Sequence, residues 1–197
     1  MASARTLGEQ VYAWAYGRLG QRVGAGAPWE LAHYALRGAG IVNSASPLDS
    51  GLSGVWGEPI ALPRALPGDV LQLRNYAVVA STLHTAYFDD GTTRQHSDET
   101  AHRYASHIAI VAAPPDERSV SVLEQVAQAG PRVRQRAILL RDCGPIVQRT
   151  FQWQQDGLGR LRPCTLVQRT VLRVTGIARV YRASAAACLG AASQPST

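Results

Sequence analysis

The sequence predicts an α+β protein in which N-terminal helices pack on an antiparallel β-sheet. Two observations carry this prediction. Apolar residues recur with the period of a helix over roughly the first 36 positions, and from residue 66 onward they alternate with polar residues as in strands. Helices first and strands afterwards is the order typical of the α+β class, and the chain shows no internal repeat.

Two helices are expected near the N-terminus. Leu7, Val11 and Trp14 fall on one side of a helical projection over residues 6–20. A glycine-rich loop follows, and a second helix is predicted over residues 29–37, ended by Gly38 and the glycine two positions later.

Strand patterns fill most of the remaining chain. Residues 43–68 are rich in Ser, Pro and Gly and predict a long surface connection that carries Trp56. The expected strands cover residues 70–74, 78–88, 107–111, 119–124, 132–136, 151–154, 166–174 and 177–181. The polar stretch from Asp89 to Tyr104 predicts a mobile loop. We therefore expect one domain over residues 1–183 and a disordered Ala/Ser-rich tail over residues 184–197.

Charge is distributed unevenly along the chain. All 20 basic side chains are arginines, and the formal net charge is +6. From Pro131 onward, eleven arginines accompany only Asp142 and Asp156. Such a basic half can attract an anionic cell wall, membrane surface or other polyanion, although a solvated arginine-rich sheet face is the plainer explanation. No nucleic-acid motif or interleaved aromatic platform occurs, so nucleic acid is not an expected partner.

No segment predicts export or membrane insertion. The first residues, Met1 to Arg5, precede no long apolar region, and no run approaches the roughly 18 apolar residues of a membrane span. We expect a protein that is cytoplasmic as synthesised, with export by a signal-independent route left open. Cys143, Cys164 and Cys188 lack the spacing of metal ligands and are predicted to be ordinary thiols.

Three segments have the order and residue types of a cysteine-hydrolase site. Such a site needs a thiol at a helix N-terminus, an imidazole to hold the thiolate and a third polar group to orient the imidazole. The glycine turn and helix at 24–36 come first, and His107 then opens an apolar strand. Glu124 ends the following strand, where a short hairpin would place it beside His107 and fix the ring tautomer.

These segments resemble the NlpC-type and CHAP-type branch of the papain-like superfamily, amidases and peptidases that often act on peptidoglycan. The resemblance covers about residues 6–126. Ala65–Leu73 matches the Leu-x-Pro-Gly-Asp turn and first strand of these families, and Ser106–Val111 matches their histidine strand. Glu124-Gln125 matches the start of the Glu-x-Asn element of CHAP-type members, which ends here in Val126.

The resemblance implies a mechanism and roles for individual residues. His107 would act as base and then acid, and Glu124 would orient it. A backbone N–H at the start of the helix over residues 28–36 would donate to the oxyanion. The chemistry would be thiol attack on an amide, an acyl-enzyme intermediate, and hydrolysis or transfer, with no cofactor and no metal. The implied substrate is a peptide of the bacterial cell wall or another amide, with a host-protein or lipid amide as the second alternative.

The expected nucleophile is missing from the chain. The family's cysteine position holds Pro28, a residue that suits the first turn of a helix and cannot attack an amide. Alternatively, Ala27 replaces a cysteine that was silenced because the active protein, a wall-cutting amidase or toxin, harms its host. A third alternative is a natural pseudoenzyme that binds a peptide or glycan in the old groove.

Other residues have less specific patterns. Trp29 and Trp56 are candidates for lining a substrate groove, with aromatic core packing as the default. His84, His96 and His102 resemble a metal cluster by count alone, so no metal site is predicted. The rival function is a catalytically dead binding module that holds an anionic partner with its arginines; the residues to test are Arg132, Arg134, Arg136, Arg169 and Arg173.

Overall fold

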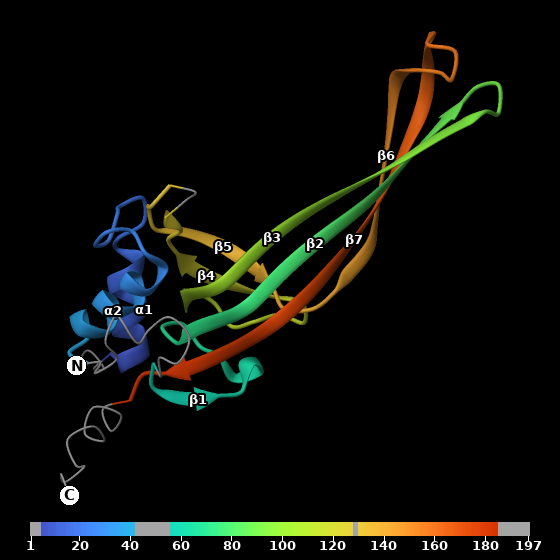
Figure 1. Ribbon diagram of the computed structural model, residues 1–197. Coiled ribbons are helices and arrows are strands. Elements are labelled where there is room, and N and C mark those ends of the chain that lie inside the picture. Colours follow the sequence, from blue (N-terminus) through green and yellow to red (C-terminus); the bar gives the residue numbers. More distant parts are fainter. Residues whose placement is uncertain (1–4, 42–55, 128–129, 185–197) are drawn as a thin grey trace, which may run out of the picture. The chain divides into compact units, whose positions relative to one another are not determined.

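The computed structural model describes residues 5–41, 56–127 and 130–184 (Figure 1). Two N-terminal helices pack against a seven-stranded antiparallel sheet, so the α+β prediction is confirmed at this level. The elements in chain order are α1 Leu7–Tyr16, α2 Pro28–Gly38, β1 Glu58–Ile60, the 3-10 helix η1 Leu62–Arg64, β2 Val70–Phe88, β3 Thr93–Val111, β4 Ser119–Glu124, β5 Arg134–Leu139, β6 Cys143–Gln155 and β7 Leu161–Arg182.

Local sequence explains where both helices begin. Thr6 caps α1, since its hydroxyl accepts from the Glu9 N–H at 3.2 Å and the Glu9 carboxylate accepts from the Thr6 N–H at 2.7 Å. Pro28 is the first residue of α2, where a missing N–H costs nothing. Glu30 completes this helix start by accepting from the Ala27 N–H at 2.8 Å.

The sheet has the strand order β1-β7-β2-β3-β4-β5, and β6 pairs with β7 outside this path. The β4–β5 pairing places Glu124 opposite Arg134 and Val122 opposite Arg136. The β3–β4 pairing places Ile110 opposite Leu123. The candidate catalytic glutamate therefore lies at the end of β4 with arginines on the neighbouring strand.

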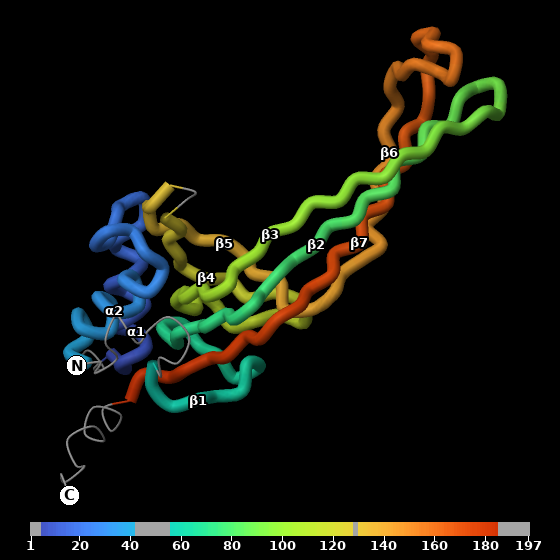
Figure 2. The backbone as a smooth tube through the Cα atoms, viewed as in Figure 1, coloured from blue at the N-terminus to red at the C-terminus, as the bar shows by residue number. Residues whose placement is uncertain are grey.

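The chain divides into two compact units, and one domain over residues 1–183 stays a prediction. Unit 1 contains residues 1–76, 104–140 and 176–197, and unit 2 contains residues 77–103 and 141–175. The long strands β2, β3 and β7, which Figure 2 draws as a smooth trace, contribute residues to each unit.

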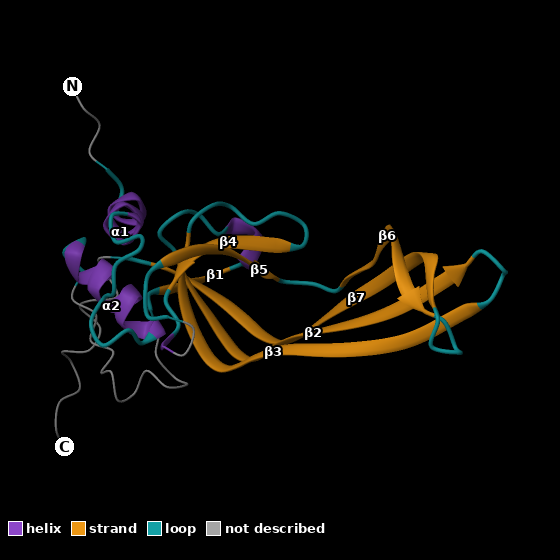
Figure 3. Cartoon of the chain, turned by 90° about the horizontal axis from the view of Figure 1, so that it is seen from above, coloured by secondary structure: helices purple, strands orange, loops and turns teal. Residues whose placement is uncertain are grey.

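Unit 1 contains the larger core of the described chain. Side chains from α1 and α2 pack with apolar residues of the sheet, and both helices lie beside the strand ends of this unit (Figure 3). The core residues include Val11, Leu31 and Leu36 from the helices and Ile110, Leu123 and Tyr181 from the strands, all at most 7% exposed. This packing fixes the start of α2 against the strands that carry His107 and Glu124.

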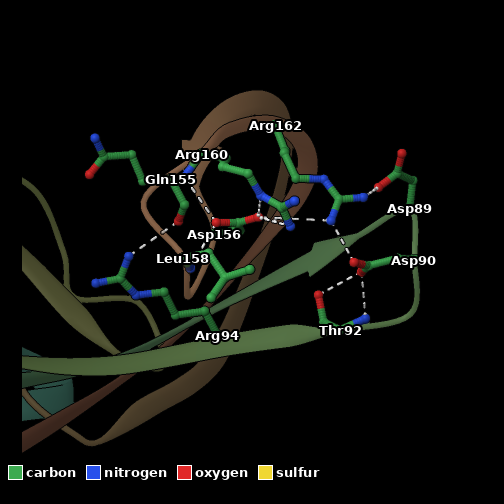
Figure 4. A network of polar contacts seen from close by, with 9 residues as sticks. All are labelled: Asp89, Asp90, Thr92, Arg94, Gln155, Asp156, Leu158, Arg160 and Arg162. Atoms are coloured by element: carbon green, nitrogen blue, oxygen red, sulfur yellow. Dashed lines mark hydrogen bonds and ion pairs between the residues drawn. The ribbon is translucent and has the colours of Figure 1, made fainter.

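Unit 2 is a set of long strands with a small core. Its buried apolar cluster consists of Ala86, Phe88, Cys164 and Leu166. The turns of its two hairpins are held by carboxylates and arginines (Figure 4). Arg162 forms ion pairs with Asp89 and Asp90, and Arg160 donates to Asp156 at 3.0 Å.

Several sequence expectations need correction. The predicted mobile loop over residues 89–104 is wrong beyond its turn, because β3 begins at Thr93. Residues 93–103 are exposed, so this part of the strand lacks the apolar alternation that identifies a half-buried strand. The predicted strands 70–74 and 78–88 form one strand, β2. The predicted connection over 43–68 contains β1 and η1, while its residues 42–55 and the tail from 185 lie outside the described residues.

Candidate functional site

His107 and Glu124 form a buried pair in unit 1. The Nε2 atom of His107 lies 2.7 Å from Oε2 of Glu124, and the two side chains are 1% and 0% exposed. β3 carries the histidine and β4 the glutamate, and these strands pair through Ile110 and Leu123. The structure thus places the two residues together as the sequence predicted.

Arginines complete the environment of the Glu124 carboxylate. Oε1 accepts from Nη2 of Arg134 at 3.0 Å and lies 3.5 Å from Nη1 of Arg136. Burial alone would raise the pKa of Glu124, but the hydrogen bond from His107, together with these two arginines, holds that pKa below its usual value. The glutamate is therefore ionised at neutral pH.

An ionised Glu124 fixes the protonation of the facing histidine nitrogen. A carboxylate can only accept, so Nε2 of His107 must carry the proton and donate it. Nδ1 of the same ring is buried and has no hydrogen-bond partner among the described residues. In the neutral ring, Nδ1 carries a lone pair that accepts no hydrogen bond from a described residue. A general base needs such a lone pair to take up a proton.

Tyr104 packs flat against the histidine. Its ring is stacked on His107 with centroids 4.5 Å apart, and its hydroxyl lies 3.2 Å from Nη1 of Arg136. Tyr76 stacks behind it, and burial raises the pKa of Tyr76 to about 12. Sequence reasoning missed Tyr104 because this residue ends the predicted loop over residues 89–104. Even in a strand, residues three apart are expected on opposite faces.

Gln125 joins the end of β4 to the start of α2. This fully buried amide donates to the Ala27 carbonyl at 2.7 Å and to the Val23 carbonyl at 3.0 Å, and it accepts from the Val23 N–H at 3.2 Å. It directly follows Glu124 in the chain. The sequence indicated Gln125 only as the middle residue of a Glu-x-Asn-like element. No pattern in the sequence predicted that its side chain would bind the start of the helix.

Positions 27 and 28 occupy different places at the start of α2. Ala27 precedes the helix in an extended conformation, and its N–H is already donated to Glu30. Position 28 is the first helical residue, where any residue except proline would present a free N–H at the positive end of the helix dipole. Leu31 and Ala32 are both fully buried below this turn.

The two tryptophans proposed for a groove pack in the core of unit 1. Trp56 is 3% exposed and belongs to the buried cluster, and Trp29 is partly buried against that cluster. Trp29 also meets the His33 ring edge-on at 5.8 Å. The default interpretation of core packing therefore describes both side chains.

The cysteines and arginines are distributed over both units. Cys143 and Cys164 lie in unit 2, and Cys188 lies outside the described residues, so the described part of unit 1 contains no thiol. Arg132 donates to the Gly20 carbonyl at 2.9 Å, while Arg134 and Arg136 face Glu124. The other two arginines proposed for an anionic partner, at 169 and 173, lie in unit 2.

One group of side chains in the described chain could hold a metal ion. It consists of His84, His96 and Asp98 in unit 2, and it does not include His102.

Comparisons with protein-family models, with curated proteins and with solved structures give no match for this chain. Among the described residues, neither helix has the length and apolar character needed to cross a membrane.

Proposed function

We propose that this chain is a papain-like amidase or peptidase domain that keeps its acid–base pair and lacks its nucleophile. The proposal is carried by the buried His107–Glu124 pair, whose Nδ1 has no hydrogen-bond partner among the described residues. An unpaired buried polar atom costs about 1–3 kcal/mol, so most histidines that only stabilise a fold have both ring nitrogens satisfied. The proposed ligand is a peptide or other amide of the bacterial cell wall.

The start of α2 supplies the rest of the proposed site. Gln125 directly follows Glu124 and donates a hydrogen bond to the Ala27 carbonyl. This bond anchors the start of the helix to the strand that carries Glu124. Position 28 begins the helix, where the dipole stabilises a thiolate. The N–H of a non-proline residue at this position would also serve as an oxyanion donor. These features favour position 28 over position 27 for the missing thiol.

Restoring the thiol tests this proposal. The variants Pro28→Cys and Ala27→Cys are made in a background with the three native cysteines replaced by serine or alanine. We expect P28C to react with iodoacetamide about ten times faster at pH 6.5 than a thiol placed by Tyr34→Cys on the exposed face of the same helix. A27C should react like the Y34C control. His107→Ala should remove the advantage of P28C.

The same variants report on the reaction itself. P28C is incubated with purified peptidoglycan, and release of new amino groups is measured, with P28C/H107A as the matched control. The proposal fails if P28C is alkylated no faster than Y34C. If P28C gains thiolate reactivity but releases no amines from peptidoglycan, the site is retained and the cell-wall amide is excluded as its substrate.

A further inference from the structure

Unit 2 contains a second cluster of titratable side chains, separate from the His107–Glu124 pair. His84 lies on β2, and His96 and Asp98 lie on β3. The two imidazole rings stack with centroids 4.4 Å apart and planes at 8°. Residues 96 and 98 share one face of β3 because side chains alternate along a strand.

The distances within this cluster approach those of a metal centre. The carboxylate Oδ2 of Asp98 lies 3.0 Å from Nε2 of His84 and 3.7 Å from Nε2 of His96. The ligand atoms of all three residues lie within 4.8 Å of one another. Ligands at about 2.0–2.2 Å from a tetrahedral zinc ion are separated by about 3.3–3.6 Å. Small rotations of the exposed His96 and Asp98 side chains would bring the ligand atoms of the three residues to these separations.

Gln168 on β7 orients the first imidazole. The side-chain amide nitrogen of Gln168 lies 3.1 Å from Nδ1 of His84, and the His84 side chain is 14% exposed. Turning this amide by 180° would bring its oxygen to Nδ1–H, and Nε2 of His84 would then keep its lone pair for a metal. A hydrogen bond to the second ring nitrogen is the usual support of a metal-binding histidine.

We infer that His84, His96 and Asp98 bind one zinc-like divalent transition-metal ion. Two imidazoles and one carboxylate form a donor set that zinc accepts, and sites with three protein ligands keep a fourth position open. His96 and Asp98 are each 59% exposed, so that position faces solvent and accepts water or a donor group from a partner. The inference is independent of the proposed amidase-type site.

Zinc titration of the whole chain by isothermal calorimetry tests the inference. We expect one ion per chain with micromolar or tighter affinity, and a weakening of at least tenfold in each of His84→Asn, His96→Asn and Asp98→Asn. His102→Asn is the matched control on β3 and should bind as the parent does. Gln168→Ala should weaken binding about tenfold without removing it, as expected for a supporting hydrogen bond.

Two further measurements separate this site from other sources of zinc binding. The titration is repeated after alkylation of the accessible thiols, which should leave the stoichiometry at one. Cobalt(II) should give the intense visible absorption of a tetrahedral site in the parent and lose it in H96N, whose exposed position keeps the fold intact. Absence of saturable binding, or equal weakening by H102N, would overturn the inference.

Discussion

At the residue scale, the molecule keeps an ionised glutamate in a solvent-free position. Glu124 is fully buried, and its two oxygens are divided between His107 on one side and Arg134 with Arg136 on the other. A buried charge is tolerated only with such partners, because desolvation costs several kcal/mol per ion. The carboxylate therefore both orients the histidine and depends on it.

The pH dependence of stability follows from the lowered pKa of Glu124. The folded pKa lies below the unfolded value of about 4.3, so ionisation stabilises the fold above that pH. This contribution is lost as the pH falls through the folded pKa. We expect Glu124→Gln to lower the free energy of unfolding by about 3 kcal/mol at pH 7, and the difference from the parent to shrink below about pH 4.

Urea unfolding of both proteins at several pH values measures this effect. Glu117→Gln changes an exposed glutamate and serves as the control, with an expected change within about 0.5 kcal/mol. A difference between E124Q and the parent that stays constant from pH 7 to pH 3 would contradict the assignment of an ionised, hydrogen-bonded Glu124.

At the element scale, the Pro-Gly-Asp turn before β2 joins the sheet to α1. Gly68 has a φ of +92°, and a Cβ at this position would lie 1.9 Å from the Gly8 carbonyl oxygen. Asp69 holds the same turn by accepting from the Leu66 N–H at 2.7 Å and from Arg182 at 2.9 Å. The glycine is required here both by the left-handed conformation and by the close approach of α1.

Two glycine substitutions separate these requirements. Gly68→Ala should lower the free energy of unfolding by more than about 3 kcal/mol, because backbone atoms would have to move apart. Gly40→Ala has a similar φ of +81°, but no described residue lies within 4 Å of the added Cβ, so it should cost only about 1–2 kcal/mol. Equal losses in thermal or urea unfolding would show that the contact between the turn and α1 contributes nothing.

At the scale of the whole molecule, buried apolar surface is distributed unequally between the two units. Unit 1 packs both helices against its strands, whereas the apolar cluster of unit 2 is limited to Ala86, Phe88, Cys164 and Leu166. Large apolar side chains of β6, including Phe151 at 73% and Trp153 at 61%, are exposed. Segments with more buried apolar contacts need more free energy to open locally. We therefore expect unit 1 to be locally more stable than unit 2.

Hydrogen–deuterium exchange followed by mass spectrometry checks this difference. We expect peptides from β6 to exchange at least about tenfold faster than peptides that cover 108–111 and 120–124. Among the described strands β6 pairs with β7 alone, whereas β4 pairs with both β3 and β5, so edge position and sparse packing both favour faster exchange in β6. Equal protection in the two regions would show that the small cluster of unit 2 is as stabilising as the core of unit 1.

Sequence periodicity predicted the elements whose burial is one-sided. The helix over 29–37 and the strand 119–124 are confirmed at Pro28–Gly38 and Ser119–Glu124, since Leu31, Leu36 and Leu123 face a core. Periodicity failed for β3, because its residues 93–103 are exposed and have no reason to alternate. The candidate site was predicted as far as His107 and Glu124, whose order and spacing fit one hairpin.

The sequence by itself determined the α+β order of elements, the pairing of His107 with Glu124 and the absence of a thiol at positions 27 and 28. Only the tertiary structure decided that Gln125 anchors the start of α2, that Tyr104 stacks on His107 and that Nδ1 is left without a described partner. It also brought together His84, His96 and Asp98. Local pattern reports which face of an element is buried, whereas contacts between distant segments depend on strand pairing and packing that no short stretch encodes.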